Sequence, residues 1–405
     1  MKQITIPEKK IFEIAKNEGT PFHIYDEFVI EEKINSLKNN FKWSDYKQFF
    51  AIKANPNPNI LKIMKNNSCG VDAASVNEIK LALDSGFKGE DIMFTSNLTT
   101  LDEYEYAIEK NCVINIDWYE DIYMLYDNNL IPEKICFRLN PGGIKNDIIG
   151  DSKESKFGST RKQIEKAIEY ISKKGKKSIG LHTMVVSNER NPEIFYDYTK
   201  DIFEFAENLQ KKFDVNIEFI NIGGGIGVPY EPDQKIDISK ITKKIEQNYK
   251  KNFKNNKPKI FTESGRYITA QSGYLITKVI KKKQTFKNYI GIDATMSDLM
   301  RPGMYGSYHH ITNLSFGSND KEDYDVVGSL CENNDKFAIN RKLPITSEGD
   351  LLVIHDTGAH GHSMGFNYNG KLKHAEYIYK KNGDILKIRR DETYEDYIKT
   401  ILEGK

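Results

Sequence analysis

A lysine at the end of an apolar run is the first residue of this sequence that could do chemistry. Lys53 follows the run Phe49–Ile52, in a segment with the composition of a strand. Apolar neighbours disfavour the ammonium form of such a lysine and favour the neutral amine, which can attack a carbonyl group to form an imine. A lysine in this place can equally extend into solvent, and the residues around Lys53 alone leave both interpretations open.

A glycine-rich segment follows another apolar run. The segment Gly223–Gly227, with the sequence GGGIG, could direct several backbone N–H groups at an anion, because glycine permits the close approach that this needs. Its spacing does not match the dinucleotide-binding pattern, and Pro229 stands where the helix of that pattern should continue. The segment predicts either a phosphate-binding loop or a simple tight turn.

A carboxylate and a guanidinium flank Gly265 at the end of a third apolar run. Glu263 and Arg266 could form an ordinary surface ion pair with no further role. Together with Lys53 and the segment Gly223–Gly227, however, they complete the set of groups that pyridoxal phosphate needs. These are a lysine that forms an imine, a phosphate site and a partner for the pyridine nitrogen.

Five histidines and one cysteine in the second half of the chain are further candidates for metal binding or catalysis. The histidines lack the helical i, i+4 pairing of a metallohydrolase, so we expect no metal, although Asp356 beside them keeps a metal site open. Cys331 is a lone cysteine, and such a residue is most often a small buried hydrophobic group. The histidines concerned are His309, His310, His355, His360 and His362.

Alternating strand and helix patterns must position these groups. Ser75, Glu78 and Gly86 have the spacing of a helix start and end, and the range 191–212 repeats apolar residues every three or four positions. Eight strand–helix alternations favour a (β/α)8 barrel of the TIM type over an open doubly wound sheet, and a barrel collects its functional groups at the C-terminal ends of its strands. The expected strands are 48–53, 69–72, 92–96, 113–117, 135–140, 179–185, 217–222 and 259–263.

The chain changes character after Arg266. Short β-type runs separated by turn residues predict a second, mainly β domain, which gives an α/β protein with a barrel at 31–266 and a β domain at 267–405. Residues 1–30, with a short strand at His23–Tyr25, could join either part, and we assign them to the β domain.

Composition narrows the class of protein further. The 405 residues carry 59 lysines and arginines against 58 acidic residues, and this balance argues against a nucleic-acid-binding protein. The four cysteines have no paired spacing, which argues against a disulfide framework and against a cysteine-based zinc site. This cysteine usage indicates a reducing compartment. Met1–Lys10 lacks the apolar core of a signal peptide, and no apolar run reaches the roughly 20 residues that span a bilayer. We therefore expect a cytoplasmic protein that does not bind membranes.

Several motifs together resemble those of the fold-type III pyridoxal-phosphate decarboxylases, and within them the diaminopimelate decarboxylases. The resemblance covers nearly the whole chain and implies a barrel of the alanine-racemase and ornithine-decarboxylase type with a β domain. The motifs are AIKANP at 51–56, VDAAS at 71–75, RLNPG at 138–142, SKFG at 155–158, GGG at 223–225, ESGR at 263–266, RPGMY at 301–305, YHH at 308–310, CE at 331–332 and NYNG at 367–370.

The resemblance implies roles for single residues at a site for pyridoxal phosphate. Lys53 resembles the lysine that forms the imine, Glu263 the partner of the pyridine nitrogen, and Asp72 a group beside the imine. The other cofactor-binding positions that it implies are His182, Ser187, Gly224, Gly225, Gly265, Arg266 and His360.

The resemblance also implies a substrate site shared across a homodimer. Arg266, Arg301 and Tyr305 resemble the groups that bind the substrate's carboxylates, and His360 is expected beside them. Cys331 and Glu332 would come from the partner subunit, Cys331 as the proton donor and Glu332 at the distal amino group of the substrate. The implied reaction is the decarboxylation of meso-diaminopimelate to L-lysine and CO2, the last step of lysine biosynthesis.

Three departures from the family pattern bear on the substrate more than on the cofactor. Met184 stands where the family stacks a histidine on the cofactor ring, although a thioether can also pack against a ring. His360 replaces a tyrosine, and Ser264 replaces a proline.

Four alternatives remain from the sequence. A related decarboxylase of ornithine, lysine or a carboxypolyamine would share every cofactor residue. A non-catalytic homologue that binds the cofactor is opposed by the joint presence of Lys53, Glu263 and Cys331. An amino-acid racemase would leave Cys331 and Glu332 without a role, and a metal-dependent barrel hydrolase would need a metal site.

Overall fold

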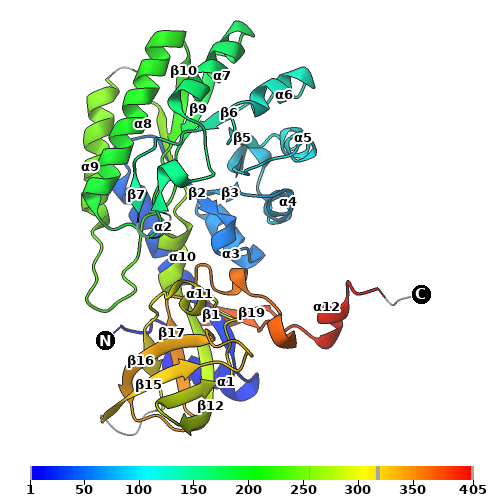
Figure 1. Ribbon diagram of the computed structural model, residues 1–405, viewed down its shortest axis with the longest axis vertical. Coiled ribbons are helices and arrows are strands. Elements are labelled where there is room, and N and C mark those ends of the chain that lie inside the picture. Colours follow the sequence, from blue (N-terminus) through cyan, green and yellow to red (C-terminus); the bar gives the residue numbers. More distant parts are fainter. Residues whose placement is uncertain (1, 147, 149, 255, 316–319, 403–405) are drawn as a thin grey trace. The chain divides into compact units, whose positions relative to one another are not determined.

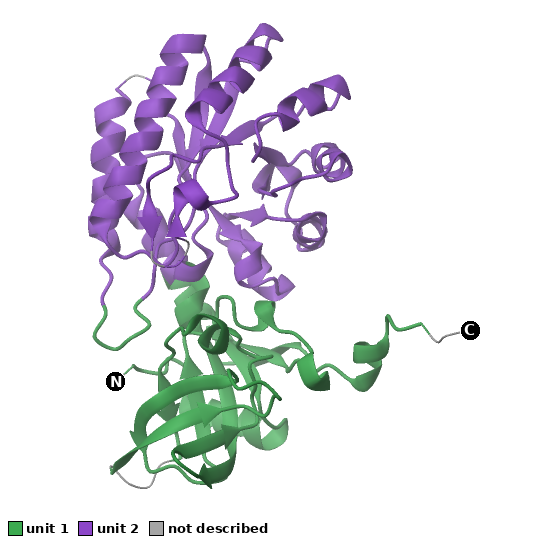
Figure 2. Cartoon of the chain, in the orientation of Figure 1, with its two compact units in different colours: residues 1–32, 229–234, 268–405 green, residues 33–228, 235–267 purple. Residues whose placement is uncertain are grey.

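The chain divides into two compact units. The computed structural model describes residues 2–146, 148, 150–254, 256–315 and 320–402. One unit comprises residues 33–228 and 235–267, and the other comprises residues 1–32, 229–234 and 268–405 (Figure 2). We call them the barrel unit and the β unit, after the structures described below.

Eight parallel strands close the barrel unit, as the alternating pattern predicts. Every neighbouring pair around the ring is parallel, so all the strands end at one face of the barrel, here called the C-terminal face (Figure 1). This arrangement excludes the open doubly wound sheet. In ring order the strands are β10 (Asn216–Asn221), β11 (Lys259–Thr262), β2 (Tyr46–Ala51), β3 (Gly70–Ala73), β4 (Ile92–Phe94), β5 (Val113–Ile116), β6 (Ile135–Arg138) and β9 (Ser178–His182).

Helices with one apolar face connect these strands. Ser75 accepts a hydrogen bond from the Glu78 N–H at the start of one helix, and Gly86 follows its end with a φ of 88°. The longest helix is capped by Asn191 and buries the apolar stripe expected from its spacing. Two of these helices, α8 and α9, lie side by side (Figure 1). The helices are α2 (Glu27–Asn40), α3 (Pro58–Asn66), α4 (Val76–Asp84), α5 (Leu101–Glu109), α6 (Asp121–Asp127), α7 (Arg161–Lys173), α8 (Pro192–Phe213), α9 (Ile238–Asn252) and α10 (Gly265–Thr269).

Aromatic and aliphatic side chains fill the inside of the barrel. Phe219 stacks on Phe261 with ring centroids 4.6 Å apart, and Phe49 packs against Phe261 at 4.9 Å. A Cβ at Gly180 would lie 2.2 Å from the Phe219 ring, so this strand position has room only for glycine. The interior cluster consists of Phe49, Met93, Val113, Cys136, Phe219 and Phe261.

The β unit is built around one mixed sheet. Strand β1 (Phe22–Asp26) lies between β12 (Gly273–Gln284) and β18 (Glu376–Tyr379), so the first residues of the chain join this unit. The short β-type runs expected after Arg266 form strands of this unit. The other strands are β13 (Asn288–Ile292), β14 (Ile311–Asn313), β15 (Lys321–Val327), β16 (Lys336–Pro344), β17 (Leu351–His355) and β19 (Ile385–Arg389), and the helices are α1 (Glu8–Asn17), α11 (Arg301–Tyr305) and α12 (Tyr394–Ile398).

Two further features concern the chain as a whole. The short segment 229–234, directly after the glycine-rich loop, groups with the β unit and not with the barrel. In the part of the chain that the structure describes, no helix is long and apolar enough to cross a membrane.

Candidate active site

Four of the expected polar groups lie together at the C-terminal face of the barrel. Asp72 is in β3, His182 ends β9, Glu263 directly follows β11, and Lys53 follows β2. Lys53 does not extend the strand as expected but lies in the 3₁₀ turn Ile52–Ala54, where its side chain is exposed. Of the two interpretations left open by the sequence, the exposed side chain agrees with extension into solvent.

Glu263 is a buried carboxylate that its neighbours keep ionised. Its Oε2 lies 3.3 Å from His182 Nε2, and its Oε1 accepts a 2.6 Å hydrogen bond from Asn221. Burial raises the pKa of Glu263, but the charge and hydrogen bond of His182, with the charges of Lys53 and Arg138, bring this pKa below its ordinary value. The site thus presents a fixed negative charge at this point.

The pKa of Asp72 is shifted in the opposite direction from that of Glu263. Asp72 is 5% exposed, and its Oδ1 has no hydrogen-bond partner among the described residues. Burial and the negative charge of Glu263 raise the pKa of Asp72 well above its usual range, while Lys53 and a hydrogen bond with Thr95 oppose this. Two carboxyl groups with pKa values shifted in opposite directions are typical of a site where one holds a charge and the other holds a proton.

Asn221 is a buried residue of this face that the sequence did not suggest. It is fully buried at the end of β10 and hydrogen-bonds through both ends of its amide. Nδ2 donates to Glu263 Oε1, and Oδ1 accepts a 2.9 Å hydrogen bond from the N–H of Gly223. One side chain therefore fixes both the carboxylate and the start of the glycine-rich loop. Its position at a strand end, two residues before Gly223, is the signal that the sequence offers.

The glycines after β10 form a loop that only glycine can build. Gly223 and Gly225 have φ values of 72° and 84°, in the left-handed region. A Cβ at Gly224 would lie 2.7 Å from the Glu263 carbonyl oxygen, and one at Gly225 would lie 2.3 Å from that of Val186. The close approach to neighbouring backbone explains why these positions carry glycine, and it is compatible both with a phosphate-binding loop and with a tight turn.

Met184 contacts this loop directly. Its Sδ lies 3.2 Å from the Gly224 N–H, as a weak acceptor. Strand β9 ends at His182, so Met184 lies in the loop that follows and not in the strand expected at 179–185, and Ser187 lies in the same loop. The Ser187 N–H donates to Asn146 Oδ1 at 3.3 Å, and Ser187 is half-buried.

A small pocket lies next to Met184. Its empty volume is about 300 Å³, and one wall is formed by Arg138, whose guanidinium stacks on the Phe157 ring at 4.5 Å and pairs with Asp117 at 3.1 Å. The motifs RLNPG and SKFG, which supported the resemblance, therefore meet here. The lining residues are Arg138, Leu139, Asn140, Gly150, Ser152, Ser155, Phe157, Met184 and Val185.

Gly265 joins the lysine turn to the carboxylate strand. A Cβ at Gly265 would lie 2.8 Å from the Ala54 side chain, and the Gly265 N–H donates to the Glu263 carbonyl at 2.8 Å. The backbone around Lys53 is thus packed directly against the backbone after Glu263. Arg266, next in the chain, is half-buried.

The remaining expected site residues belong to the β unit. Arg301 is buried, with Nη1 2.9 Å from His309 Nε2 and its guanidinium over the Tyr230 ring at 4.7 Å. His309 Nδ1 in turn lies 2.8 Å from the His355 carbonyl oxygen, so this histidine donates to a carbonyl and accepts from the arginine. Tyr305, at the end of the same short helix α11, is 58% exposed.

Cys331, Glu332 and His360 also lie in the β unit. Cys331 and Glu332 are exposed, whereas the other three cysteines, Cys69, Cys112 and Cys136, are buried. His360 has a φ of 56°, an unusual backbone angle for a residue with a side chain. Among the described residues, no three histidine, cysteine, aspartate or glutamate side chains are grouped so that they could hold a metal ion.

The residues of the barrel unit fit pyridoxal phosphate chemically. Lys53 offers a primary amine, the glycine loop can accept a phosphate, and the buried Glu263 offers a fixed negative charge. The unpartnered Oδ1 of the buried Asp72 shows that this face has hydrogen-bonding capacity that the protein itself does not use. A parallel barrel with these groups at its strand ends defines the class of barrel enzymes that use this cofactor.

Comparison with known proteins agrees with this class. The family described as "Pyridoxal-dependent decarboxylase, pyridoxal binding domain" matches residues 28–270, which is more than half of the chain. The chain therefore belongs to the pyridoxal-dependent decarboxylases.

Individual relatives match along almost their whole length. The chain is 39% identical to Protein TabA of Pseudomonas amygdali pv. tabaci, over 95% of this chain and 92% of the relative. It is 36% identical to diaminopimelate decarboxylase of Buchnera aphidicola, over 96% and 95%. The crystal structure of diaminopimelate decarboxylase from Methanocaldococcus jannaschii with L-lysine superposes with a TM-score of 0.90 at 31% identity, over 97% of this chain and 94% of that chain.

Proposed function

We propose that the protein is a pyridoxal-phosphate-dependent decarboxylase that converts meso-diaminopimelate to L-lysine and CO2. The observation that carries the proposal is the pair formed by the amine of Lys53 and the ionised carboxylate of Glu263 at one face of a closed barrel. Full-length similarity to diaminopimelate decarboxylases, one of them crystallised with L-lysine, supports the choice of substrate.

The barrel residues would hold and tune the cofactor. Bound pyridoxal phosphate supplies an electron sink for the electron pair that remains on Cα when CO2 leaves. Lys53 would hold the cofactor covalently through its amine, and the Gly224 and Gly225 amides with Ser187 would bind the phosphate. Glu263, kept ionised by His182, would accept the hydrogen bond of the protonated ring nitrogen and so keep that proton in place. Asp72 would stay protonated beside it.

Six other groups would act on the substrate. Arg266, Arg301 and Tyr305 would bind its carboxylates, and His360 would take the place of a tyrosine at the cofactor phosphate and substrate. Glu332 would bind the distal ammonium group by charge. As the bond from Cα to the carboxylate breaks, the Cys331 thiol would give its proton to Cα, and the thiolate would then recover a proton from water.

A homodimer with shared active sites is part of this proposal. Cys331 and Glu332 are exposed in the β unit, as groups offered to another subunit would be. Mixing inactive Lys53→Ala and Cys331→Ala proteins should restore CO2 release, because one mixed site would contain both intact residues. Two inactive proteins that stay inactive after mixing and subunit exchange would contradict shared sites. We place the reaction in the cytoplasm, as the cysteine usage indicates.

A second substrate class is favoured by one observation. Met184 and His360 replace residues that the family uses at the ring and the substrate, which directs attention to ornithine, lysine or a carboxypolyamine as alternative substrates of the same chemistry.

The decisive experiment measures CO2 release from the protein loaded with pyridoxal phosphate. Meso-diaminopimelate, D- and L-lysine, and D- and L-ornithine are compared in parallel, with Lys53→Ala as the inactive control. Lys62, an exposed lysine in α3, provides the matched variant Lys62→Ala, which should keep full activity. Turnover of diaminopimelate alone supports the proposal, and turnover restricted to a substrate with one carboxylate rejects it.

A further inference from the structure

Three loops of the β unit contact one another through polar side chains. The first, the Met296 turn, is residues 294–298 and leads into α11 with Arg301. The second, the Cys331 turn, is residues 328–335. The third, the Asn369 loop, is residues 367–375 and leads into β18. We call the set of their mutual contacts the three-loop junction.

Asp335 links the first two loops. It is 3% exposed, and its two carboxylate oxygens accept hydrogen bonds from different loops. Oδ1 accepts from the Met296 N–H at 2.7 Å, and Oδ2 accepts from the Leu330 N–H at 2.8 Å. The Gly328 N–H also donates to the Asp335 carbonyl oxygen at 3.0 Å, which closes the Cys331 turn on itself.

The backbone packs closely around Asp335, so that two neighbouring positions have room only for glycine. A Cβ at Gly328 would lie 2.2 Å from Asp335 Oδ2. A Cβ at Gly303, in α11, would lie 2.3 Å from the Asn334 carbonyl oxygen and 2.9 Å from Met296 Sδ. The helix that carries Arg301 and the turn that carries Cys331 are thus in direct backbone contact.

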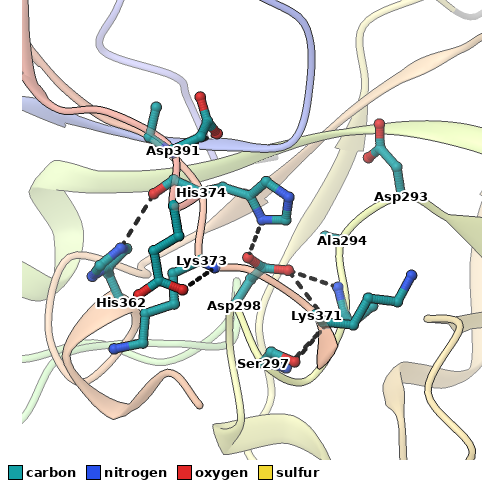
Figure 3. Close-up of polar contacts among 12 residues, drawn as sticks. Asp293, Ala294, Ser297, Asp298, His362, Lys371, Lys373, His374 and Asp391 are labelled. Carbon is teal, nitrogen blue, oxygen red and sulfur yellow. Dashed lines mark hydrogen bonds and ion pairs between the residues drawn. The ribbon is translucent and has the colours of Figure 1, made fainter. Parts of the chain in front are cut away.

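The Asn369 loop completes the junction. Asn369 Oδ1 accepts a 2.7 Å hydrogen bond from the Cys331 N–H. His374 Nδ1 lies 2.5 Å from Asp298 Oδ1, and Asp298 Oδ2 accepts from the Thr295 N–H at 2.8 Å. Figure 3 shows the His374 ring directed at Asp298, with His362 beside the His374 carbonyl. Each loop therefore contacts both of the others.

Arg301 and Cys331 depend on this junction to different degrees. Arg301 has supports of its own in His309 and Tyr230. The Cys331 side chain is exposed, and the backbone N–H groups of its turn are held by the side-chain acceptors of Asp335 and Asn369. Loss of one acceptor should therefore disturb Cys331 more than Arg301.

We propose that Asp335, together with Asn369, is a positioning residue that fixes the Cys331 turn against the helix that carries Arg301. The proposal rests on the proposed function for the task of Cys331, and neither residue touches the reacting atoms. Because the resemblance places Cys331 and Arg301 in the sites of different subunits, Asp335 would also keep the two sites of a dimer in a fixed relation.

The test uses three variants of the full-length protein loaded with pyridoxal phosphate. Asp335→Asn keeps the shape but replaces one acceptor oxygen by an NH2 donor that faces a backbone N–H. Asn369→Gly keeps the left-handed backbone, since Asn369 has a φ of 55°, and removes only the acceptor for Cys331. Asp323→Asn, at an exposed position in β15, is the matched control.

Two readouts separate positioning from general stability. Amide hydrogen exchange should accelerate about ten-fold in peptides that contain the Cys331 turn, as expected for the loss of a hydrogen bond to a charged group. The kcat for CO2 release should fall about ten-fold while KM changes less than about two-fold, because Arg301 keeps its own supports. Asp323→Asn should change neither quantity, and the melting temperature is recorded for each variant.

The outcomes are distinct. Unchanged exchange or unchanged kcat in both Asp335→Asn and Asn369→Gly overturns the proposal, as does a proportional change of kcat and KM that only follows a lower melting temperature. If Asp335→Asn does not fold, Asn369→Gly decides alone. If the wild-type protein releases no CO2 from any substrate, the proposed function fails, while the exchange of the Cys331 turn still decides whether Asp335 and Asn369 hold it.

Discussion

Asn221 donates a 2.6 Å hydrogen bond to the carboxylate of Glu263 and, through its other end, accepts one from the backbone of Gly223. The carboxylate assigned to the ring nitrogen and the loop assigned to the phosphate therefore share one buried amide. A cofactor that engaged both would be held at its two ends by groups whose spacing Asn221 sets. We therefore expect Asn221 to affect cofactor binding although it would not touch the cofactor.

Asn221→Ala should weaken cofactor binding without unfolding the barrel. A buried charged group that loses a hydrogen bond costs about 1.5–3 kcal/mol, so we expect the Kd for pyridoxal phosphate to rise at least about ten-fold. Titration of the visible absorbance measures this Kd. Asn216→Ala, at the exposed opposite end of β10, should leave it unchanged, and an equal effect of both variants would contradict the role of Asn221.

Glu263→Gln should separate cofactor binding from catalysis. The neutral amide cannot keep the ring nitrogen protonated, so CO2 release should fall by about a hundred-fold, the size of effect expected for a lost electrostatic contact to the reacting group. The protein should still become coloured with pyridoxal phosphate, because Lys53 and the glycine loop are intact. A Glu263→Gln protein with near wild-type turnover would remove Glu263 from its assigned role.

Lys53→Ala should abolish the visible absorbance of the purified protein, because that absorbance requires a covalent bond between the lysine amine and the cofactor. Spectra of Lys53→Ala and Lys62→Ala recorded after incubation with pyridoxal phosphate provide the measurement. Retention of the band in Lys53→Ala would mean that another amine holds the cofactor.

Met184→His should tighten cofactor binding. The thioether now contacts the Gly224 N–H, whereas an imidazole could stack on the cofactor ring, and an aromatic pair is worth about 0.5–1.5 kcal/mol. We expect the Kd for pyridoxal phosphate to fall by about three-fold, the lower part of that range. Met184→Leu, which removes the sulfur without adding a ring, is the control, and equal effects of the two variants would show that stacking is not the cause.

The pair of His374 and Asp298 should make the stability of the β unit depend on pH. Burial lowers the pKa of His374, but the hydrogen bond and charge of Asp298, with the charges of Asp391 and Asp293, raise it above its ordinary value overall. A raised pKa in the folded state stabilises the protein below the unfolded pKa of about 6.5, and this stabilisation is lost as the pH rises through the folded value. The melting temperature of His374→Gln should therefore lie furthest below that of the wild type near pH 6, and the gap should narrow as the pH increases.

His310 provides the control for this pH effect. Burial, with the nearby charge of Arg341, lowers the pKa of His310 to about 4, so this histidine stays neutral throughout the same range. Unfolded His310 gains a proton as the pH falls through its ordinary pKa of about 6.5, whereas the folded residue does not, so the wild type should lose stability relative to His310→Gln as the pH falls from about 7.5 to 6. This change has the opposite sign to the one expected for His374→Gln. A gap for His374→Gln that does not change with pH between about 6 and 8 would show that the ion pair does not form in solution.

The barrel could be predicted because its signals are local. Each strand is a short apolar run, and helices such as α8 carry their caps and their apolar stripe within a few residues of sequence. The sequence also places Asp72 and Glu263 at the ends of expected strands, and parallel strands bring such ends to one face. The number of alternations then favoured a closed barrel over an open sheet.

The contacts that give these residues their properties could not be predicted, since they join distant parts of the chain. Asn221 and its partner Glu263 are 42 positions apart, so the sequence around Asn221 does not reveal this hydrogen bond. The 3₁₀ turn that contains Lys53 could not be predicted from the apolar run before it. Asp335 likewise lies 39 positions from Met296, so its bridging role depends entirely on tertiary structure.

The interior of the barrel and its C-terminal face are made by different residues. Phe49, Phe219 and Phe261 pack the interior, whereas Lys53, Glu263 and the glycine loop make the face. A substitution on the face, such as the methionine at position 184, leaves the aromatic packing inside unaltered. We therefore expect a substitution on the face to cost less stability than one at the three stacked phenylalanines.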